Sequence, residues 1–437
     1  MEKLSGLSHL FITVFLYNFS TFMVVPAITD VTMSALCPGQ DECSLTIYLC
    51  GIQQAITGLG TLVMMPLMGN LSDTYGRKVM LTLPMTLTII PLGILAYSRT
   101  AGFFYAYFAI STLTSMFCGG SVACIALAYV ADNIPENRRA SAFGILSGIS
   151  SCAFVCGNLF TRFISTPTAF QVATAMAMVS LVYMRIFLKE SITELGVSTK
   201  ATENDSLLDK GPTKNVRLFK ILSLFQDTMS LLRSSSTFSQ AAIVAFFTSL
   251  GEFGLYSALM FFLKAQFHFD KDQFADLMII NGVAGTISQM VLMPLLVPLI
   301  GEEKLLATGL FFSCIHIVLY SIAWSSWVAY AAAMFSALAV FGGPCLRSIV
   351  SKQIGPSEQG KAQGCIAGIA SVANIVSPLV FSPLTALFLS DNAPFQFPGF
   401  SILCASFVVM IAFIQSIWMR APPPISSCGI SSNCVLV

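Results

Sequence analysis

Apolar segments long enough to cross a lipid bilayer recur twelve times along this 437-residue chain, and this recurrence constrains its fold most strongly. A membrane-spanning helix needs about 20 consecutive, mostly apolar residues. The segments lie at residues 7–28, 44–68, 79–98, 102–131, 139–163, 168–188, 237–263, 274–299, 304–323, 326–350, 361–389 and 397–419. Backbone polar groups inside a bilayer must pair within the segment, and these stretches lack the alternation of barrel strands. We therefore expect an all-α membrane protein with twelve transmembrane helices.

The composition excludes several other classes of protein. Only 10% of the residues are charged and 55% are hydrophobic, whereas a soluble domain is about 25% charged. A soluble protein with this composition would have too few charged side chains to cover its surface. The net charge of +1 gives no basic excess of the kind that nucleic-acid-binding proteins carry. The lipid bilayer is therefore the expected surrounding, and no nucleic-acid partner is expected.

The distribution of basic residues predicts the orientation in the membrane. Twelve spans place both termini on one side. If that side is the cytoplasm, eighteen of the 22 Lys and Arg side chains lie inside, Arg347 among them, and four lie outside. Cytoplasmic loops carry an excess of positive charge. We expect a multi-pass protein with both termini in the cytoplasm, in the plasma membrane or an endomembrane.

The two halves of the chain resemble each other. Met65-Pro66-Leu67 recurs as Met293-Pro294-Leu295, and Gly119-Gly120 recurs as Gly342-Gly343. Further matches follow in order, with an offset that falls slowly from 228 to 220 positions. This indicates two pseudo-repeated six-helix halves, an architecture in which transporters place their site between the repeats.

The expected division of the chain follows from the spans. Residues 1–188 form the first half and residues 237–419 the second, with a cytoplasmic tail at 420–437. Residues 189–236 form a cytoplasmic linker. Within it, 216–233 has apolar residues near helical spacing and fits either an amphipathic surface helix or an extension of the seventh span.

The loop after the second span carries a recognisable motif. Gly69 permits close helix approach, Asp73 can accept hydrogen bonds from a helix N-terminus, and Gly76 permits a left-handed turn. Arg77 and Lys78 follow at the cytoplasmic face. The motif resembles the signature loop of the major facilitator superfamily. This resemblance implies that Asp73 and Arg77 help to lock a gate, while the second half lacks the same run of residues.

Other loops resemble a narrower group. Ala128–Asp132 with Arg138 resembles the loop after span four of tetracycline-type proton antiporters, and Ser351–Gln353 resembles their loop after span ten. The eukaryotic relatives of that group, the hippocampus-abundant-transcript-like proteins, are the family that the chain resembles most. In span five, Gly157 is followed by Asn158 where the antiporters have Gly-Pro, and span four lacks their embedded Arg.

Ionisable residues inside a bilayer are costly and mark functional sites. Glu252 lies midway along the seventh span, where an apolar environment favours the neutral carboxyl and suits reversible protonation. We predict Glu252 as a proton-coupling group, with a structural acid as the alternative. His316 in span nine is a second candidate, although a packing role is more common. The polar residues predicted to line a substrate cavity or to tie helices together are Asn18, Gln54, Tyr256, Asn281 and Asn374.

The sequence shows few signs of disulfide bonding, metal binding or catalysis. Cys37 and Cys43 lie in the first outside loop and are a candidate disulfide in an oxidising exterior. No cluster has metal-ligand spacing, no phosphate-binding loop or nucleophile elbow appears, and no cofactor or enzyme activity is expected. The predicted function is secondary active transport of a small organic solute by a monomer, coupled to protons. A uniporter of the same fold and a non-transporting receptor or scaffold are the alternatives.

Overall fold

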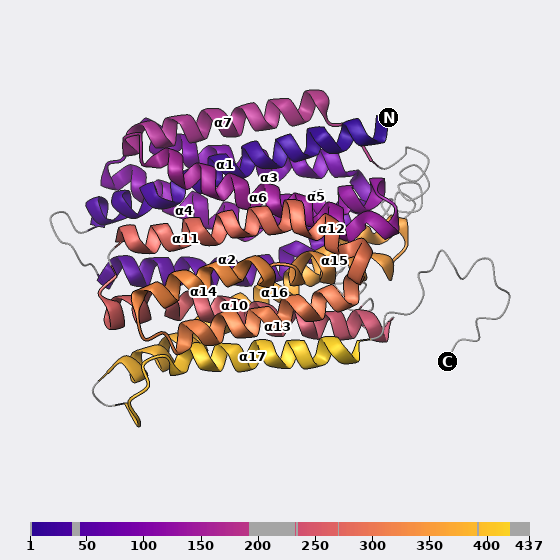
Figure 1. The fold of residues 1–437 in the computed structure, drawn as a ribbon. Helices are drawn as coiled ribbons and strands as arrows, with labels where there is room; N and C mark the ends of the chain where they lie inside the picture. Colours follow the sequence, from indigo (N-terminus) through magenta and orange to yellow (C-terminus); the bar gives the residue numbers. More distant parts are fainter. Residues whose placement is uncertain are drawn as a thin grey trace, which may run out of the picture.

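The computed structural model describes residues 2–36, 44–191, 232, 235–269, 271–390 and 393–419. Within these residues, twelve helices are long and apolar enough to cross a membrane, which confirms the predicted fold. They form one bundle with roughly aligned axes (Figure 1). The candidate disulfide of Cys37 and Cys43, the tail and almost all of the predicted 216–233 helix lie outside the described residues.

The first six spans use seven α-helices, because the fourth span is broken in two. Their bounds are α1 (Glu2–Leu36), α2 (Ser44–Tyr75), α3 (Arg77–Tyr97), α4 (Ala101–Cys118), α5 (Ser121–Asn133), α6 (Arg139–Thr161) and α7 (Thr166–Phe187). The break between α4 and α5 falls at Gly119-Gly120. Gly120 has a φ of 76°, a conformation that glycine adopts without the steric cost of a side chain.

The last six spans repeat this pattern. Their bounds are α10 (Ser236–Phe267), α11 (Lys271–Ile287), the π-helical turn η2 (Ser288–Leu292), α12 (Met293–Ile300), α13 (Glu302–Ser321), α14 (Ser326–Ala339), α15 (Gly342–Lys352), α16 (Gln359–Leu389) and α17 (Phe400–Trp418). The break between α14 and α15 falls beside Gly342-Gly343, the repeat of Gly119-Gly120. The short 3₁₀ turns η1 (Glu136–Arg138) and η3 (Pro356–Glu358) also occupy equivalent places before α6 and α16.

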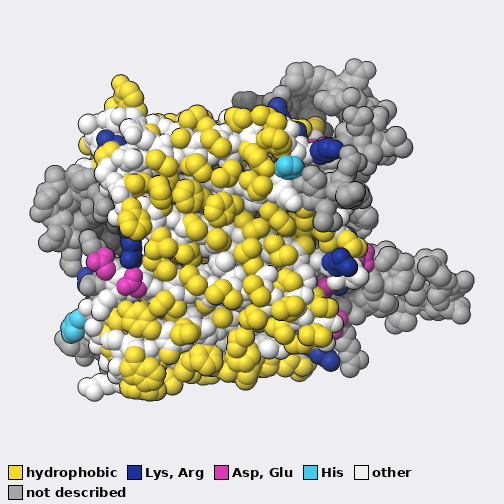
Figure 2. Space-filling view, turned by 45° about the horizontal axis from the view of Figure 1, so that its top comes forward, with side chains coloured by type: hydrophobic (Ala, Val, Ile, Leu, Met, Phe, Trp, Pro, Cys, Tyr) yellow, Lys and Arg dark blue, Asp and Glu magenta, His cyan; other side chains and the backbone are white. Residues whose placement is uncertain are grey.

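The surface and the core match a membrane environment. Apolar side chains cover the middle of the face seen in Figure 2, and charged side chains gather at its two ends. The first residues of α1 and the last residues of α17 lie at the same end of the bundle (Figure 1). We call this end the terminal end and the other the distal end. Two buried apolar clusters lie within the first half, and a third is built almost entirely from the second half.

The two halves meet where α16 packs on α2 and α5 and where α6 packs on α11, α12 and α15, with the most extensive contact between α2 and α16. Near the terminal end, α2 and α16 approach so closely that a Cβ on Gly69 would collide with the backbone of Gly360. Gly364 packs against the backbone of Met65 in the same way. Each half thus has a core of its own, and the contact between α2 and α16 rests on small residues, as in transporters built from two repeats that move relative to each other.

Candidate functional site

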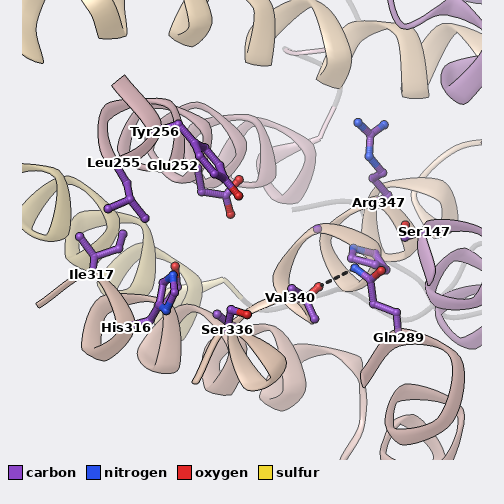
Figure 3. Close-up of a pocket in the computed structure, with 14 residues that line it drawn as sticks. Ser147, Glu252, Leu255, Tyr256, Gln289, His316, Ile317, Ser336, Val340 and Arg347 are labelled. Carbon is purple, nitrogen blue, oxygen red and sulfur yellow. Dashed lines mark hydrogen bonds between the residues drawn. The ribbon is translucent and has the colours of Figure 1, made fainter. Parts of the chain in front are cut away.

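A polar cavity lies between the halves, mainly against the second half. Its volume is about 310 Å³, at the lower end of the range for small-molecule sites. Figure 3 shows the side chains that line it. The polar and ionisable residues among them are Ser147 of α6, Glu252 and Tyr256 of α10, Gln289 of η2, Ser313 and His316 of α13, Ser336 of α14 and Arg347 of α15. We call this space the central cavity.

Glu252 and Tyr256 extend into the central cavity from successive turns of α10. The carboxylate of Glu252 points into the open space (Figure 3). It is exposed there, and it makes no hydrogen bond or ion pair with any residue that the structure describes. Tyr256 is 57% exposed although it lies within a membrane span. The structure therefore places the predicted coupling acid and one predicted cavity residue in the same cavity.

His316 faces the same cavity from α13 but is held more tightly. Its Nδ1 lies 2.7 Å from the carbonyl oxygen of Ala332, and its ring packs edge-on against Tyr320 at 4.9 Å between centroids. A carbonyl only accepts hydrogen bonds, so Nδ1 carries the hydrogen. In the neutral ring Nε2 is then the acceptor, and His316 can receive a hydrogen bond without gaining charge.

Arg347 is the functional candidate that the sequence analysis missed. The charge count assigned it to the cytoplasmic side, whereas the structure places it on the wall of the central cavity, in the middle of α15. Its Nη1 donates to Oε1 of Gln363 at 3.2 Å. The segment 326–350 already contained Arg347, so an Arg inside a predicted span was the available signal.

A second cavity adjoins the same arginine. It measures about 380 Å³ and is lined by both halves, including Gln54 of α2, Ser115 of α4, Asn374 of α16 and Arg347. We call it the interface cavity. The structure thus places Gln54 and Asn374, two of the predicted cavity residues, in the same cavity. Arg347 lines both this cavity and the central cavity that contains Glu252.

Two other predicted cavity residues lie elsewhere. Asn18 donates from Nδ2 to Oγ of Ser150 at 2.9 Å and so links α1 to α6. Asn281 lies on α11, with its side chain next to Tyr320 of α13. Neither lines the central or the interface cavity.

The signature loop forms a buried network at the terminal end. Arg77, which is 0% exposed, contacts Asp73 at 2.5 Å and Asp132 at 2.9 Å. The carboxylate of Asp73 also accepts hydrogen bonds from the backbone N–H groups of Gly360 and Lys361, at 2.9 and 2.7 Å. Because those groups begin α16, the helix dipole favours the carboxylate there. Asp73 of the first half thereby binds the N-terminus of α16 in the second half.

Several residues support this network. Gly76 has a φ of 95° and allows the sharp turn into α3. Glu190 accepts hydrogen bonds from the backbone N–H groups of Arg77 and Lys78, and the sequence analysis did not single it out. Arg138 is exposed, but its neighbour Arg139 is buried and donates to the carbonyl of Ser351 in the other half at 3.0 Å. The predicted loop therefore joins the halves through Arg139.

The second half carries a counterpart of this network with its charges exchanged. Gly301 has a φ of 88°, like Gly76, and Glu302 follows it where Arg77 follows Gly76. Glu302 contacts Lys352 at 2.8 Å. Lys352 lies 220 positions after Asp132, so the positions that hold an Arg–Asp pair in the first half hold a Glu–Lys pair in the second. The second half lacks the sequence motif, but it has the same glycine turn and an ion pair at the equivalent positions.

This exchanged pair gives a testable expectation. Replacing Lys352 with Met should lower the folding stability by about 1–3 kcal/mol, because Glu302 would remain buried without its partner. Exchanging the two residues, Glu302→Lys with Lys352→Glu, should restore most of the loss. Thermal unfolding in detergent measures this, with Lys304→Met at an exposed position as the control. An exchanged variant less stable than the Met variant would contradict the pairing.

Contacts between the halves differ at the two ends of the bundle. At the terminal end they are the buried hydrogen bonds of Asp73 and Arg139. At the distal end, the ion pair between Arg162 of α6 and Asp276 of α11 has both side chains about half exposed. Exposed pairs contribute little stability. The close packing of α2 on α16 at Gly69 and Gly360, together with these buried bonds, closes the terminal end in this structure.

Two six-helix halves around a polar cavity, with buried polar contacts between them at one end, are the arrangement of a membrane transporter. Comparison with known proteins gives the family. The family model of the Major Facilitator Superfamily matches residues 10–378 and, again, residues 241–429. The chain belongs to this superfamily, as its signature loop indicated.

Individual relatives agree with this assignment. The chain is 25% identical to the Hippocampus abundant transcript 1 protein of Mus musculus over 347 residues, which cover 78% of this chain and 67% of the relative. It is 22% identical to the class C tetracycline resistance protein of Escherichia coli over 377 residues, 85% and 88% of the two chains. The crystal structure of the human organic anion transporter MFSD10 superposes with a TM-score of 0.77 at 17% identity, covering 95% of this chain and all of that one.

Proposed function

We propose that this protein is a secondary active transporter that moves a small organic solute by alternating access, with the movement coupled to protons through Glu252. The observation that carries the proposal is the carboxylate of Glu252, which has no partner among the described residues and lies in a cavity between two separately packed halves. A carboxyl in an apolar span is costly when charged. Its proton can therefore be exchanged as the cavity opens to one side or the other.

The similar proteins support transport in general and leave the solute open. One is named for organic anions and one for tetracycline resistance, and a shared fold does not fix a substrate. In the proposed orientation the basic terminal end faces the cytoplasm. The lock of Asp73 and Arg77 then closes the cytoplasmic side. Breaking its contacts to Gly360 and Lys361 would accompany opening to that side.

The test begins with purified protein and a panel of drugs, sugars, amino acids and organic acids, screened for thermal stabilisation at pH 5.5 and 7.5. A ligand at 100 times its dissociation constant stabilises the folded state by about 2.7 kcal/mol. A solute identified in this way is then followed in proteoliposomes with and without a pH gradient. The expected result is accumulation driven by the gradient.

Glu252→Gln should abolish the accumulation driven by the pH gradient and leave solute exchange in place. Glu303→Gln, at an exposed position outside the cavity, is the matched control. An unchanged response to the gradient in Glu252→Gln would show a structural acid and move the function to uniport. Binding without flux in the wild type would move it to a receptor.

A further inference from the structure

Arg347 is a cation on the wall of the central cavity, and the contact of its guanidinium described above, with Gln363, is to a neutral side chain. No carboxylate lies within ion-pair distance of it among the residues that the structure describes. A charged side chain within a membrane span is costly when no opposite charge lies beside it. Such a residue is retained in a membrane protein when it serves a function.

Gln363 holds the arginine in place, and among the residues that the structure describes its guanidinium has no other hydrogen-bond partner. Its Nη1 donates to Oε1 of Gln363, and the Nε2 of Gln363 donates back to the backbone carbonyl of Arg347, both at 3.2 Å. Gln363 is fully buried, so it fixes the side chain from behind. A guanidinium has five N–H donors in a planar fork. The remaining donors suit a carboxylate or another planar or tetrahedral oxyanion.

The position of Arg347 gives it access to both cavities. It lines the central cavity with Glu252 and the interface cavity with Gln54 and Asn374. The interface cavity is built from both halves. A solute that binds Arg347 would therefore touch both moving parts, as alternating access requires.

The rest of the central cavity suits an apolar body. Leu255, Ile317 and Val340 line it between the polar groups (Figure 3). The exposed ring of Tyr256 adds an aromatic face. Together with one fixed cation, this lining favours a compact solute that has an apolar or aromatic body and a single anionic group.

We propose that Arg347 binds the anionic group of the transported solute, and that the solute is an organic carboxylate or sulfonate with an apolar body. This inference rests on the proposed function, because it names the class of solute for the same cavity. The charge of Arg347 then has a partner during transport, which accounts for its place in the membrane.

The same residues determine whether protonation of Glu252 favours or opposes binding of the anion. The ionisable side chains that face the central cavity are Glu252, Tyr256, His316 and Arg347. Of the other helices packed on α10, α17 carries no charged side chain, and the single one on α16, Lys361, pairs with Glu358. An ionised Glu252 repels an anion in this cavity, whereas a protonated one does not. The anion and the proton therefore bind together.

The test measures binding of three probes that share one skeleton to the purified full-length protein: 2-naphthoate, naphthalene-2-sulfonate and the uncharged 2-naphthamide. The wild type should bind the two anions more tightly than the amide, and more tightly at pH 5.5 than at pH 7.5. Arg347→Gln should weaken both anions about tenfold or more, the loss of a charged hydrogen bond, and leave the amide unchanged. Arg347→Lys, which keeps the charge but not the fork, should retain part of the preference.

Arg185→Gln is the matched control, because Arg185 is an exposed cation outside both cavities. A wild type without preference for the anions, or an Arg347→Gln variant that binds them as tightly as the wild type, would overturn the inference. If Arg347→Gln does not fold, a reduced preference for the anions in a folded Arg347→Lys variant supports the inference and full retention overturns it. Binding needs no flux, so anion binding without transport would refute the proposed function alone.

Discussion

Replacing Arg77 with Met should destabilise the folded protein by about 3–5 kcal/mol, the cost of breaking a buried ion pair by removing one partner. Arg77 is fully buried and contacts the carboxylates of Asp73 and Asp132. Without it, both acids stay in the interior with their negative charges uncompensated. Because Met fills a similar volume, the loss of folding stability comes mainly from the missing charge and not from altered packing.

Thermal unfolding of the purified variants measures this loss. Arg77→Lys should recover only part of the stability, because one ammonium cannot reproduce the separate bonds to Asp73, Asp132 and Ser72. Arg185→Met, at an exposed position, should change stability by less than about 0.5 kcal/mol. If Arg77→Met were as stable as that control, the network would not hold the terminal end.

The membrane fold could be predicted from the sequence because the bilayer imposes one simple rule on every span. Each span must be a helix of sufficient length and low polarity, and hydropathy detects this locally. The end of α2 shows the limit of the rule. The predicted segment stops at residue 68, whereas α2 continues to Tyr75 through polar residues of the signature loop. A helix that runs past the apolar layer is held by tertiary contacts, here those of Asp73 and Arg77.

The candidate site was predictable only in part, for a related reason. Glu252 lies in the middle of its span, so its place within the membrane follows from its position in the sequence alone. Arg347 lies near a span end, where a basic side chain is usually anchored at the membrane surface. The break between α14 and α15 and the bond to Gln363 place it at the cavity instead. These features depend on how distant segments pack, and neither hydropathy nor charge counting detects them.

Gly360 offers the sharpest test of the closed state. Substitution to Val should open the terminal end, because a Cβ at this position would collide with the carbonyl of Gly69 and the side chains of Ser72 and Arg77. Overpacking of this kind costs about 1–3 kcal/mol. The cost applies only while α2 and α16 are in contact, so it falls on the closed state. Since ~1.4 kcal/mol is a factor of ten in an equilibrium constant, the open state should gain up to about a hundredfold.

Cys124 provides the readout, because it lines the interface cavity and is only 1% exposed in the closed structure. In proteins that keep Cys124 as their only cysteine, a membrane-impermeant maleimide is added from the side of the terminal end. Gly360→Val should react at least several times faster than the parent, whereas Gly355→Val, at a glycine with no neighbour within 4 Å of the added atom, should not. Equal rates in all three would mean that α2 and α16 do not form the gate. A faster rate in Gly360→Val alone would show that the contact of Gly69 with Gly360 sets the balance between the closed and open states.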